Sequence, residues 1–173
     1  MKEVVLIVAF DGYQQTEYHD TKKTLIDAGI HVNIASSKRG AAVAKDGSSC
    51  QIDLTIDQIN PTKVDGVFII GGPGALDDLN NMKMHQILQK IYAAHVPCGA
   101  ICISTRILAY SGILNGKQAT GWNEDGKLED LYKEHNIVYV PSPVVIDDLI
   151  ITAEGPHCAK EFGKAIIQVL KKN

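Results

Sequence analysis

Cys102 is the residue whose surroundings best suit covalent chemistry. It directly follows a short apolar segment that contains Gly99 and Ala100, and a helix is expected to begin just after it. A thiol at such a sharp strand-to-helix turn occupies a nucleophile-elbow position, where the positive end of the helix dipole favours the thiolate. The alternative is that Cys102 packs as a small hydrophobic side chain, as most cysteines do.

Two further segments could complete a site around this thiol. Glu17 stands near the start of the first expected helix, where its carboxyl could act as an acid toward Cys102 or simply complement the helix dipole. The run Gly71-Gly72-Pro73-Gly74 follows an apolar strand, and its backbone N–H groups could bind a developing oxyanion or merely form a tight turn. The run matches no phosphate-binding or dinucleotide-binding fingerprint.

These segments follow apolar, β-branched runs that alternate with amphipathic segments. Strands are expected at residues 4–10, 30–35, 67–70, 97–101 and 117–122, and helices at 16–28, 84–94, 107–114, 124–135 and 162–170. Asp46-Gly47 and Asp147-Asp148 each separate two short apolar runs and predict hairpins. The alternation predicts one α/β domain over residues 1–173, with a mostly parallel sheet between helices. Because sites in such sheets form beyond the carboxyl ends of the strands, Cys102, Glu17 and the glycine run are expected to meet there.

The composition argues against several classes of function. The 173 residues carry 17 basic and 20 acidic side chains, and a formal net charge of −3 gives no electrostatic reason to expect a nucleic-acid or anionic-membrane partner. No apolar run approaches the ~20 residues of a bilayer span, and the first residues lack the features of a signal peptide. A cytoplasmic location is therefore expected, where the four cysteines stay reduced. Their spacing predicts no zinc site.

Taken together, the segments resemble a known family. Residues 11–17 (Asp-Gly-Tyr-Gln-Gln-Thr-Glu), 69–75 (Ile-Ile-Gly-Gly-Pro-Gly-Ala) and 100–102 (Ala-Ile-Cys) look like the motifs of the ThiJ/PfpI superfamily, which includes intracellular peptidases, deglycases and isocyanide hydratases. Further similarity at residues 35–40, 60–65, 108–116 and 152–156 extends the resemblance over nearly the whole chain. It implies a flavodoxin-like three-layer sandwich of the class I glutamine amidotransferase type.

The resemblance also implies roles for individual residues. Cys102 matches the family's elbow nucleophile, and Glu17 matches the carboxylic acid that hydrogen-bonds its thiolate. The backbone N–H groups of Gly71, Gly72 and Ile103 match the anion pocket. The family is usually dimeric and uses no metal or organic cofactor, so a homodimer without a cofactor is expected.

Two histidines that are usual in the family are missing. Ile103 follows the nucleophile where the peptidase-like branch has one, and Gly121 stands where the deglycase and glyoxalase branch commonly has another. An imidazole proton shuttle contributes about 10²–10⁴-fold to a rate. His157, in the loop after Pro156, is the candidate substitute, the alternative being a solvated side chain at a helix start. Its neighbour Cys158 is the other thiol considered near the pocket.

These residues lead to three functional hypotheses. The first is a cysteine-dependent enzyme, of hydrolase or glyoxalase/deglycase type, in which Cys102 attacks a small carbonyl or amide substrate and Glu17 relays a proton. The second is a redox-sensing or stress-protective protein whose Cys102 is oxidised, since oxidation needs a thiolate but no general base. The third is a catalytically inactive interaction module. The first ranks ahead because the rest of the site is in the family's register.

Overall fold

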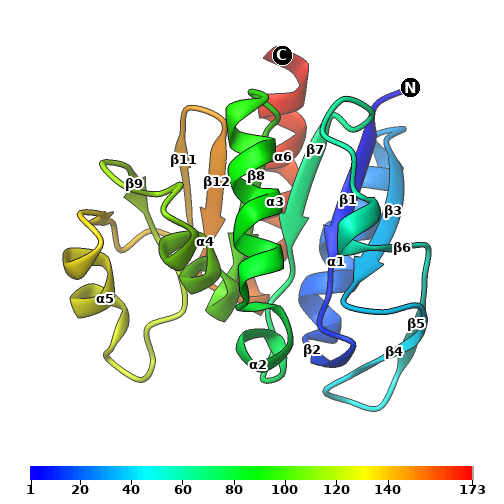
Figure 1. The fold of residues 1–173 in the computed structure, drawn as a ribbon, viewed down its shortest axis with the longest axis horizontal. Helices are drawn as coiled ribbons and strands as arrows, with labels where there is room; N and C mark the ends of the chain where they lie inside the picture. Colours follow the sequence, from blue (N-terminus) through cyan, green and yellow to red (C-terminus); the bar gives the residue numbers. More distant parts are fainter. Residues whose placement is uncertain (173) are drawn as a thin grey trace.

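A seven-stranded sheet forms the centre of the molecule in the computed structural model, which describes residues 1–172 (Figure 1). The strand order is β11-β12-β8-β7-β1-β3-β6. The strands are β1 (Glu3–Ile7), β3 (His31–Ser36), β6 (Leu54–Thr55), β7 (Gly66–Ile69), β8 (Cys98–Ile101), β11 (Val144–Asp147) and β12 (Ile150–Ala153). Neighbouring strands pair in parallel except β11 and β12, which form an antiparallel hairpin at one edge. The predicted α/β class with a mostly parallel sheet is confirmed.

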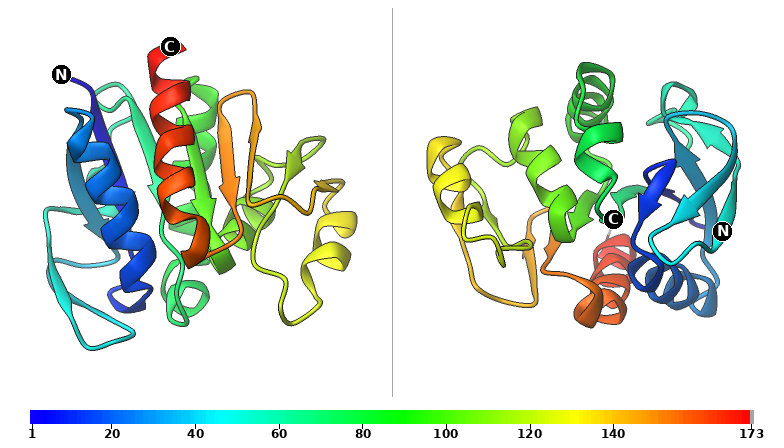
Figure 2. Two further views of the ribbon diagram at one scale, coloured as in Figure 1. Left: turned by 180° about the vertical axis from the view of Figure 1, so that it is seen from behind. Right: turned by 90° about the horizontal axis from the view of Figure 1, so that it is seen from below.

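Helices cover both faces of this sheet, which explains why its central strands are continuous apolar runs. On one face lie α2 (Ala75–Leu79), α3 (Met82–Ala93) and α4 (Thr105–Ser111), and seen from behind α1 (Gln15–Asp27) and α6 (Ala159–Lys172) lie side by side on the other (Figures 1 and 2). Every residue of β7 and β8 is buried as a result. The arrangement is the three-layer sandwich implied by the resemblance.

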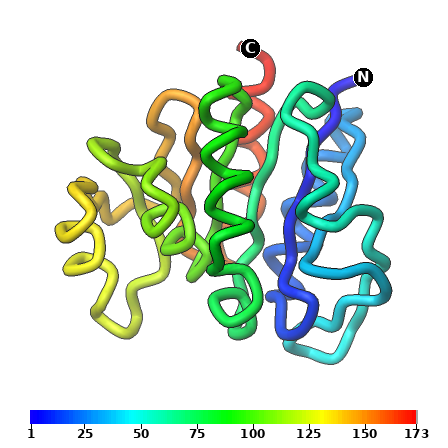
Figure 3. The backbone as a smooth tube through the Cα atoms, in the orientation of Figure 1, coloured from blue at the N-terminus to red at the C-terminus, as the bar shows by residue number. Residues whose placement is uncertain are grey.

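The buried faces of the helices complete the core. In α6 the apolar residues recur at helical spacing and are buried, and the ring of Phe162 meets that of Phe68 from β7 edge to face at 5.9 Å. None of the helices described over residues 1–172 is long and apolar enough to cross a membrane. Both the N-terminus and the end of α6 lie at the end of the sheet where β1 begins (Figure 3). The site residues are expected at the opposite end, beyond the carboxyl ends of the parallel strands.

Two small sheets flank the central one. The first joins β2 (Asp11–Tyr13), β4 (Gly40–Ala44) and β5 (Ser49–Ile52), and the second joins β9 (Gln118–Ala119) and β10 (Val138–Tyr139). Both predicted hairpins are present, as β4–β5 and β11–β12. Short strands differ from the sequence expectation: residues 11–13 form a strand by pairing with β4, and the strand expected at 117–122 shrinks to β9.

The remaining elements are short. Helix α5 (Leu128–Glu134) confirms the exposed helix expected in that region, although it is shorter than expected. Three 3-10 segments complete the chain: η1 (Ile56–Gln58), η2 (Cys102–Ser104) and η3 (Pro156–Cys158). Segment η2 joins β8 to α4 without a loop, and η3 joins the end of β12 to α6. Both therefore lie at the carboxyl edge of the sheet.

Candidate active site

Cys102 lies at the sharp turn between β8 and α4. It is a non-glycine residue with positive φ (63°), a conformation that costs free energy for an L-amino acid and that the surrounding structure must impose. Its side chain is 9% exposed. The elbow carbonyl is held from both sides, because it accepts hydrogen bonds from Thr105 Oγ1 at 3.0 Å and from the Trp122 N–H at 3.3 Å. The turn is thus fixed by its own hydrogen bonds.

Glu17 and Gly71 meet Cys102 at this turn. Glu17 lies in the first turns of α1 and is 0% exposed. Its Oε2 accepts a hydrogen bond of 2.7 Å from the Gly71 N–H. A Cβ atom added at Gly71 would lie 2.6 Å from Cys102 Cβ and 2.7 Å from Glu17 Oε2, so only glycine leaves room for the two side chains. The second oxygen, Oε1, is buried without a well-formed hydrogen bond, and the Cys102 thiol is the side chain that interacts with the carboxyl.

The protonation of the two groups is linked. Burial raises the pKa of Glu17 to about 7, and the hydrogen bonds from Gly71 and Cys102 do not offset this rise. Burial and then the negative charge of Glu17 raise the pKa of Cys102, while the Ile103 N–H acts in the opposite direction. Near neutrality the pair therefore loses the Glu17 proton, and the remaining proton stays on the Cys102 thiol until it is transferred to the carboxylate. Its thiolate form carries a neutral Glu17 that can donate through Oε1.

The backbone donors differ in part from the expectation. The Ile103 N–H faces the Cys102 sulfur, as its effect on the pKa of that thiol indicates. Gly71, expected as an anion-binding donor, instead gives its N–H to Glu17 Oε2, so that N–H is already used. Gly72 has a positive φ of 130°, and a Cβ there would collide with the Gly12 carbonyl oxygen. The role of Gly72 as an anion-binding donor stays a prediction.

The glycine run also joins two loops through their backbones. The Gln14 N–H donates to the Gly71 carbonyl at 2.9 Å, and the Gly74 N–H donates to the Gly12 carbonyl at 3.1 Å. A Cβ at Gly74 would collide with the Asp11 carbonyl. The loop after β1, which leads to Glu17, is therefore in direct backbone contact with the loop after β7.

His157 is not brought to Cys102. Its side chain is 66% exposed, and its Nε2 lies 3.2 Å from Glu154 Oε2. The groups in residues 1–172 that shift the pKa of Cys102 are Glu17, Ile103 and Cys158, and none is an imidazole. The ring of His157 is thus turned toward solvent, and its role as a substitute for the missing family histidine stays a prediction.

The neighbouring Cys158 turns inward instead. It is 2% exposed, and its Sγ donates to the Gly155 carbonyl at 3.1 Å. Its charge acts on Cys102, and the charge of Glu17 acts on it. Sequence reasoning considered this thiol but did not assign it to the site. In η3 the side chain of His157 faces outward and that of Cys158 faces inward. This alternation is the signal that could have assigned Cys158, and not His157, to the interior.

The second missing histidine has no room in this fold. A Cβ at Gly121 would collide with Thr105 Oγ1, the group that holds the elbow carbonyl. The segment is further fixed by Arg106, whose guanidinium lies 5.5 Å from the Trp122 ring centroid and 2.7 Å from Asp125 Oδ1. Sequence reasoning missed this buried arginine, which anchors the wall of the site without touching the thiol.

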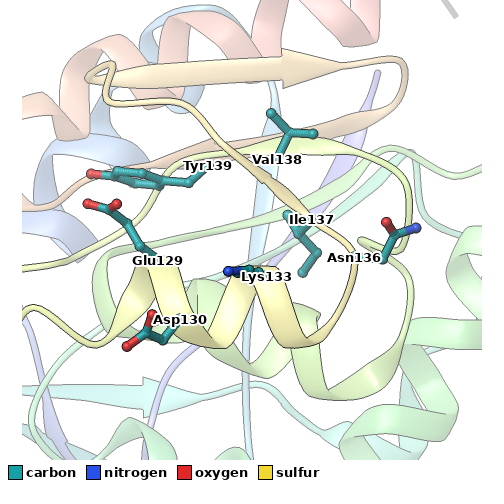
Figure 4. A pocket seen from close by; sticks show the side chains of 7 residues that line it. All are labelled: Glu129, Asp130, Lys133, Asn136, Ile137, Val138 and Tyr139. Atoms are coloured by element: carbon teal, nitrogen blue, oxygen red, sulfur yellow. The ribbon is translucent and has the colours of Figure 1, made fainter.

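Two hollows in the surface lie elsewhere. One of about 450 Å³ lies between α5 and β10 (Figure 4) and is lined by Glu129, Asp130, Lys133, Asn136, Ile137, Val138 and Tyr139. The other, of about 520 Å³, lies between η1 and α3. Neither is lined by Cys102 or Glu17, so these two hollows are separate from that pair of side chains. Residues 1–172 contain no cluster of three or more side chains that could hold a metal ion.

Known proteins are similar to this chain in sequence. A model of the DJ-1/PfpI family matches residues 2–169. An uncharacterized protein of Methanocaldococcus jannaschii is 30% identical, with 99% of this chain and 83% of that protein aligned. A deglycase of Pyrococcus horikoshii is 27% identical (96% and 99%), and a glutathione-independent glyoxalase of Caenorhabditis elegans is 24% identical (98% and 89%).

The similarity extends to solved structures. A ThiJ/PfpI domain protein from Brachyspira murdochii superposes with a TM-score of 0.91 at 26% identity, over 99% of this chain and 97% of that one. The family model covers almost the entire sequence, and the three-layer fold is shared. The resemblance drawn from the three motifs is confirmed, and the chain belongs to the DJ-1/PfpI family.

Proposed function

We propose that this protein is an enzyme that converts small 2-oxoaldehydes through the Cys102 thiol. The observation that carries the proposal is the contact between Cys102 and the buried carboxyl of Glu17, which together hold one mobile proton near neutrality. The relatives named deglycase and glyoxalase support this class of function. The restricted exposure of the thiol favours a small substrate.

The first step is addition of the Cys102 thiolate to the aldehyde carbon. A carbon–sulfur bond forms, the carbonyl electron pair moves to oxygen, and that oxygen takes the proton held by Glu17 to give a hemithioacetal. We assign to the Ile103 N–H, which interacts with the Cys102 sulfur, the stabilisation of the developing negative charge.

The later steps use the same carboxyl. Glu17, now ionised, removes the proton from the carbon bonded to sulfur, and a proton returned to the neighbouring carbon yields a thioester. One water then hydrolyses the thioester, releasing a 2-hydroxy acid and restoring the thiol. The sum is one 2-oxoaldehyde plus one water giving one 2-hydroxy acid, so no external oxidant or reductant is needed.

The amide-hydrolase alternative is less well supported. Cleavage of an amide requires a proton for the leaving amine, a role that histidine commonly fills beside a nucleophilic thiol. His157 lies against Glu154 at the surface, and Gly121 leaves no space for an imidazole. Oxidation of Cys102 as a sensor, an inactive interaction role and assembly as a homodimer all stay predictions.

Turnover of methylglyoxal tests the proposal. Purified protein is expected to consume the aldehyde and form lactate, followed by proton NMR. Cys102→Ala should abolish the activity, and Glu17→Gln should lower it by about 100-fold or more, because the amide cannot relay a proton. Cys98→Ala, which changes a buried cysteine earlier in β8, is the matched control and should remain active. Turnover by Cys102→Ala at the wild-type rate would overturn the proposal.

A further inference from the structure

A second cysteine, far from Cys102 in the sequence, faces two tyrosines. Cys50 lies on β5, opposite Ala42 of β4, and is half-buried, whereas Cys98, Cys102 and Cys158 are buried. The two tyrosines come from other elements, Tyr13 from the end of β2 and Tyr18 from α1. The small sheet β2-β4-β5 thus brings a partly accessible thiol to two aromatic side chains that belong to no part of the site described above.

Both phenol groups interact with the Cys50 side chain. The hydroxyls of Tyr13 and Tyr18 each interact with Cys50, and their rings meet edge to face at 5.3 Å. Burial and then the neighbouring Cys50 raise the pKa of both hydroxyls, so both stay protonated and act as donors. Lys22 Nζ donates to the Tyr18 oxygen at 2.9 Å, which polarises that hydroxyl further toward the sulfur.

The hydroxyl of Tyr13 lacks a hydrogen-bond acceptor. Tyr13 is 0% exposed, yet its hydroxyl makes no well-formed hydrogen bond. A buried hydroxyl without a partner costs free energy, and such a group in a folded protein calls for an explanation. Sulfur is a weak acceptor, so the Cys50 thiol satisfies this hydroxyl poorly. An oxygen atom bonded to the Cys50 sulfur would be a stronger acceptor for the hydrogen bond from the Tyr13 hydroxyl.

We propose that Cys50 is a site of oxidation by a hydroperoxide, and that the oxygen added to its sulfur accepts the hydrogen bond that the Tyr13 hydroxyl lacks. The thiolate attacks one peroxide oxygen, a sulfur–oxygen bond forms and the oxygen–oxygen bond breaks. Sulfur loses two electrons, and the departing oxygen leaves with the thiol proton as water when the oxidant is hydrogen peroxide. The product is a sulfenic acid held by two phenol donors.

The environment of Cys102 differs in both respects that matter for this step. Cys102 is 9% exposed, which restricts the access of peroxide, and its partner is the Glu17 carboxyl and not a phenol. Cys50 combines greater access with the hydroxyl donors of Tyr13 and Tyr18. The inference is independent of the 2-oxoaldehyde chemistry, because it uses another thiol on another sheet.

Trapping of sulfenic acid tests the inference. Wild-type protein is treated with a small excess of hydrogen peroxide in the presence of dimedone, and the adducts are located by peptide mass spectrometry. Dimedone is expected first on the Cys50 peptide, absent from that position in Cys50→Ser, and unchanged in Cys102→Ala. Tyr13→Phe is expected to lower the Cys50 adduct severalfold, whereas Tyr110→Phe, which alters an exposed tyrosine on α4, should leave it unchanged.

A second measurement separates stabilisation of the added oxygen from simple access. Tyr13→Phe keeps the ring that packs against Tyr18, and alkylation of Cys50 by iodoacetamide should proceed at the wild-type rate in this variant. Equal dimedone yields in Tyr13→Phe and wild type would overturn the inference. Oxidation of Cys102 before Cys50 in the wild-type protein would also overturn it, and this outcome needs no variant to fold.

Discussion

Cys102 and Cys50 are the same side chain in opposite acid–base surroundings. Cys102 is paired with a carboxyl whose pKa burial raises to about 7, so its partner both gives and takes a proton near neutrality. Cys50 is paired with two phenols whose pKa values are raised, so its partners can only donate. The comparison teaches that what a neighbouring group can do with a proton decides which chemistry a thiol can carry out: the proposed proton relay at Cys102, and the proposed stabilisation of an added oxygen at Cys50.

The two thiols also differ in the kinds of group that surround them. Around Cys102, Gly71 leaves the space in which the thiol meets Glu17, and the Ile103 N–H faces the sulfur. Around Cys50 the interacting groups are side chains alone, the hydroxyls of Tyr13 and Tyr18. Substitutions of glycine should therefore damage the first region selectively, and conservative changes of side chains should tune the second.

The largest effect is expected from Gly71→Ala. The added carbon would lie 2.6 Å from Cys102 Cβ and 2.7 Å from Glu17 Oε2, so the pair must separate. Methylglyoxal turnover should fall by about 100-fold or more, while alkylation of Cys50 continues at the wild-type rate. Gly29→Ala is the control: its added Cβ meets open space, and the positive φ (77°) at this position should cost about 1 kcal/mol of stability and no activity. Equal losses at both thiols would contradict the separation.

The next effect is the pH dependence of the two thiols. Glu17 loses its proton near pH 7, and its negative charge then raises the pKa of the Cys102 thiol beyond what burial alone does. Alkylation of Cys102 by iodoacetamide should therefore rise only above neutral pH in the wild type, and should rise at a lower pH and severalfold faster in Glu17→Gln, where that charge is absent. The profile of Cys50 should not change. Identical Cys102 profiles in the two proteins would show that the Glu17 charge does not act on the thiol.

A smaller effect concerns stability. The folded protein holds the Glu17 proton up to a pKa of about 7, against 4.5 for the free side chain, so it binds more protons than the unfolded chain between those values. This stabilising contribution is complete below pH 4.5 and is lost as the pH rises through 7. The loss is on the order of 3 kcal/mol. Urea unfolding should show this decline in the wild type and a flatter profile in Glu17→Gln, and parallel profiles would refute it.

The smallest effect is expected at Lys22. Its ammonium donates to Tyr18 at 2.9 Å, and Lys22→Met removes that polarisation without altering the ring. The yield of the Cys50 dimedone adduct should fall by a factor of about 2 to 3, in line with a surface interaction of a few tenths of a kcal/mol to 1 kcal/mol, and methylglyoxal turnover should be unchanged. Lys23→Met, which loses only an exposed pair with Asp27, is the matched control and should alter neither.

Sequence reasoning predicted the features that depend on local pattern. The central strands are long apolar runs, the hairpins carry Asp46-Gly47 and Asp147-Asp148 at their turns, and these signals are read directly from the chain. The meeting of Glu17, Gly71 and Cys102 followed from one rule, that the carboxyl ends of parallel strands share an edge. The order of the three motifs along the chain, together with this rule, was sufficient to predict that these residues meet.

What could not be predicted depends on contacts between distant segments. Strands β2, β9 and β10 are two or three residues long and exist because remote partners pair with them, so they have no periodic signal. The inward turn of Cys158 and the outward turn of His157 depend on how η3 enters α6. Cys50, Tyr13 and Tyr18 come from β5, β2 and α1, and these three segments share no sequence motif.

The backbone contact between the loops after β1 and β7 has a consequence for motion. The amides of Gln14 and Gly74 donate across this contact, so neither loop can open without breaking bonds of the other. We expect these two amides to exchange with deuterium at a common, slow rate, and to accelerate together in Gly72→Ala. Under the proposed function, a substrate would therefore reach Cys102 through rotations of surrounding side chains and not through opening of either loop.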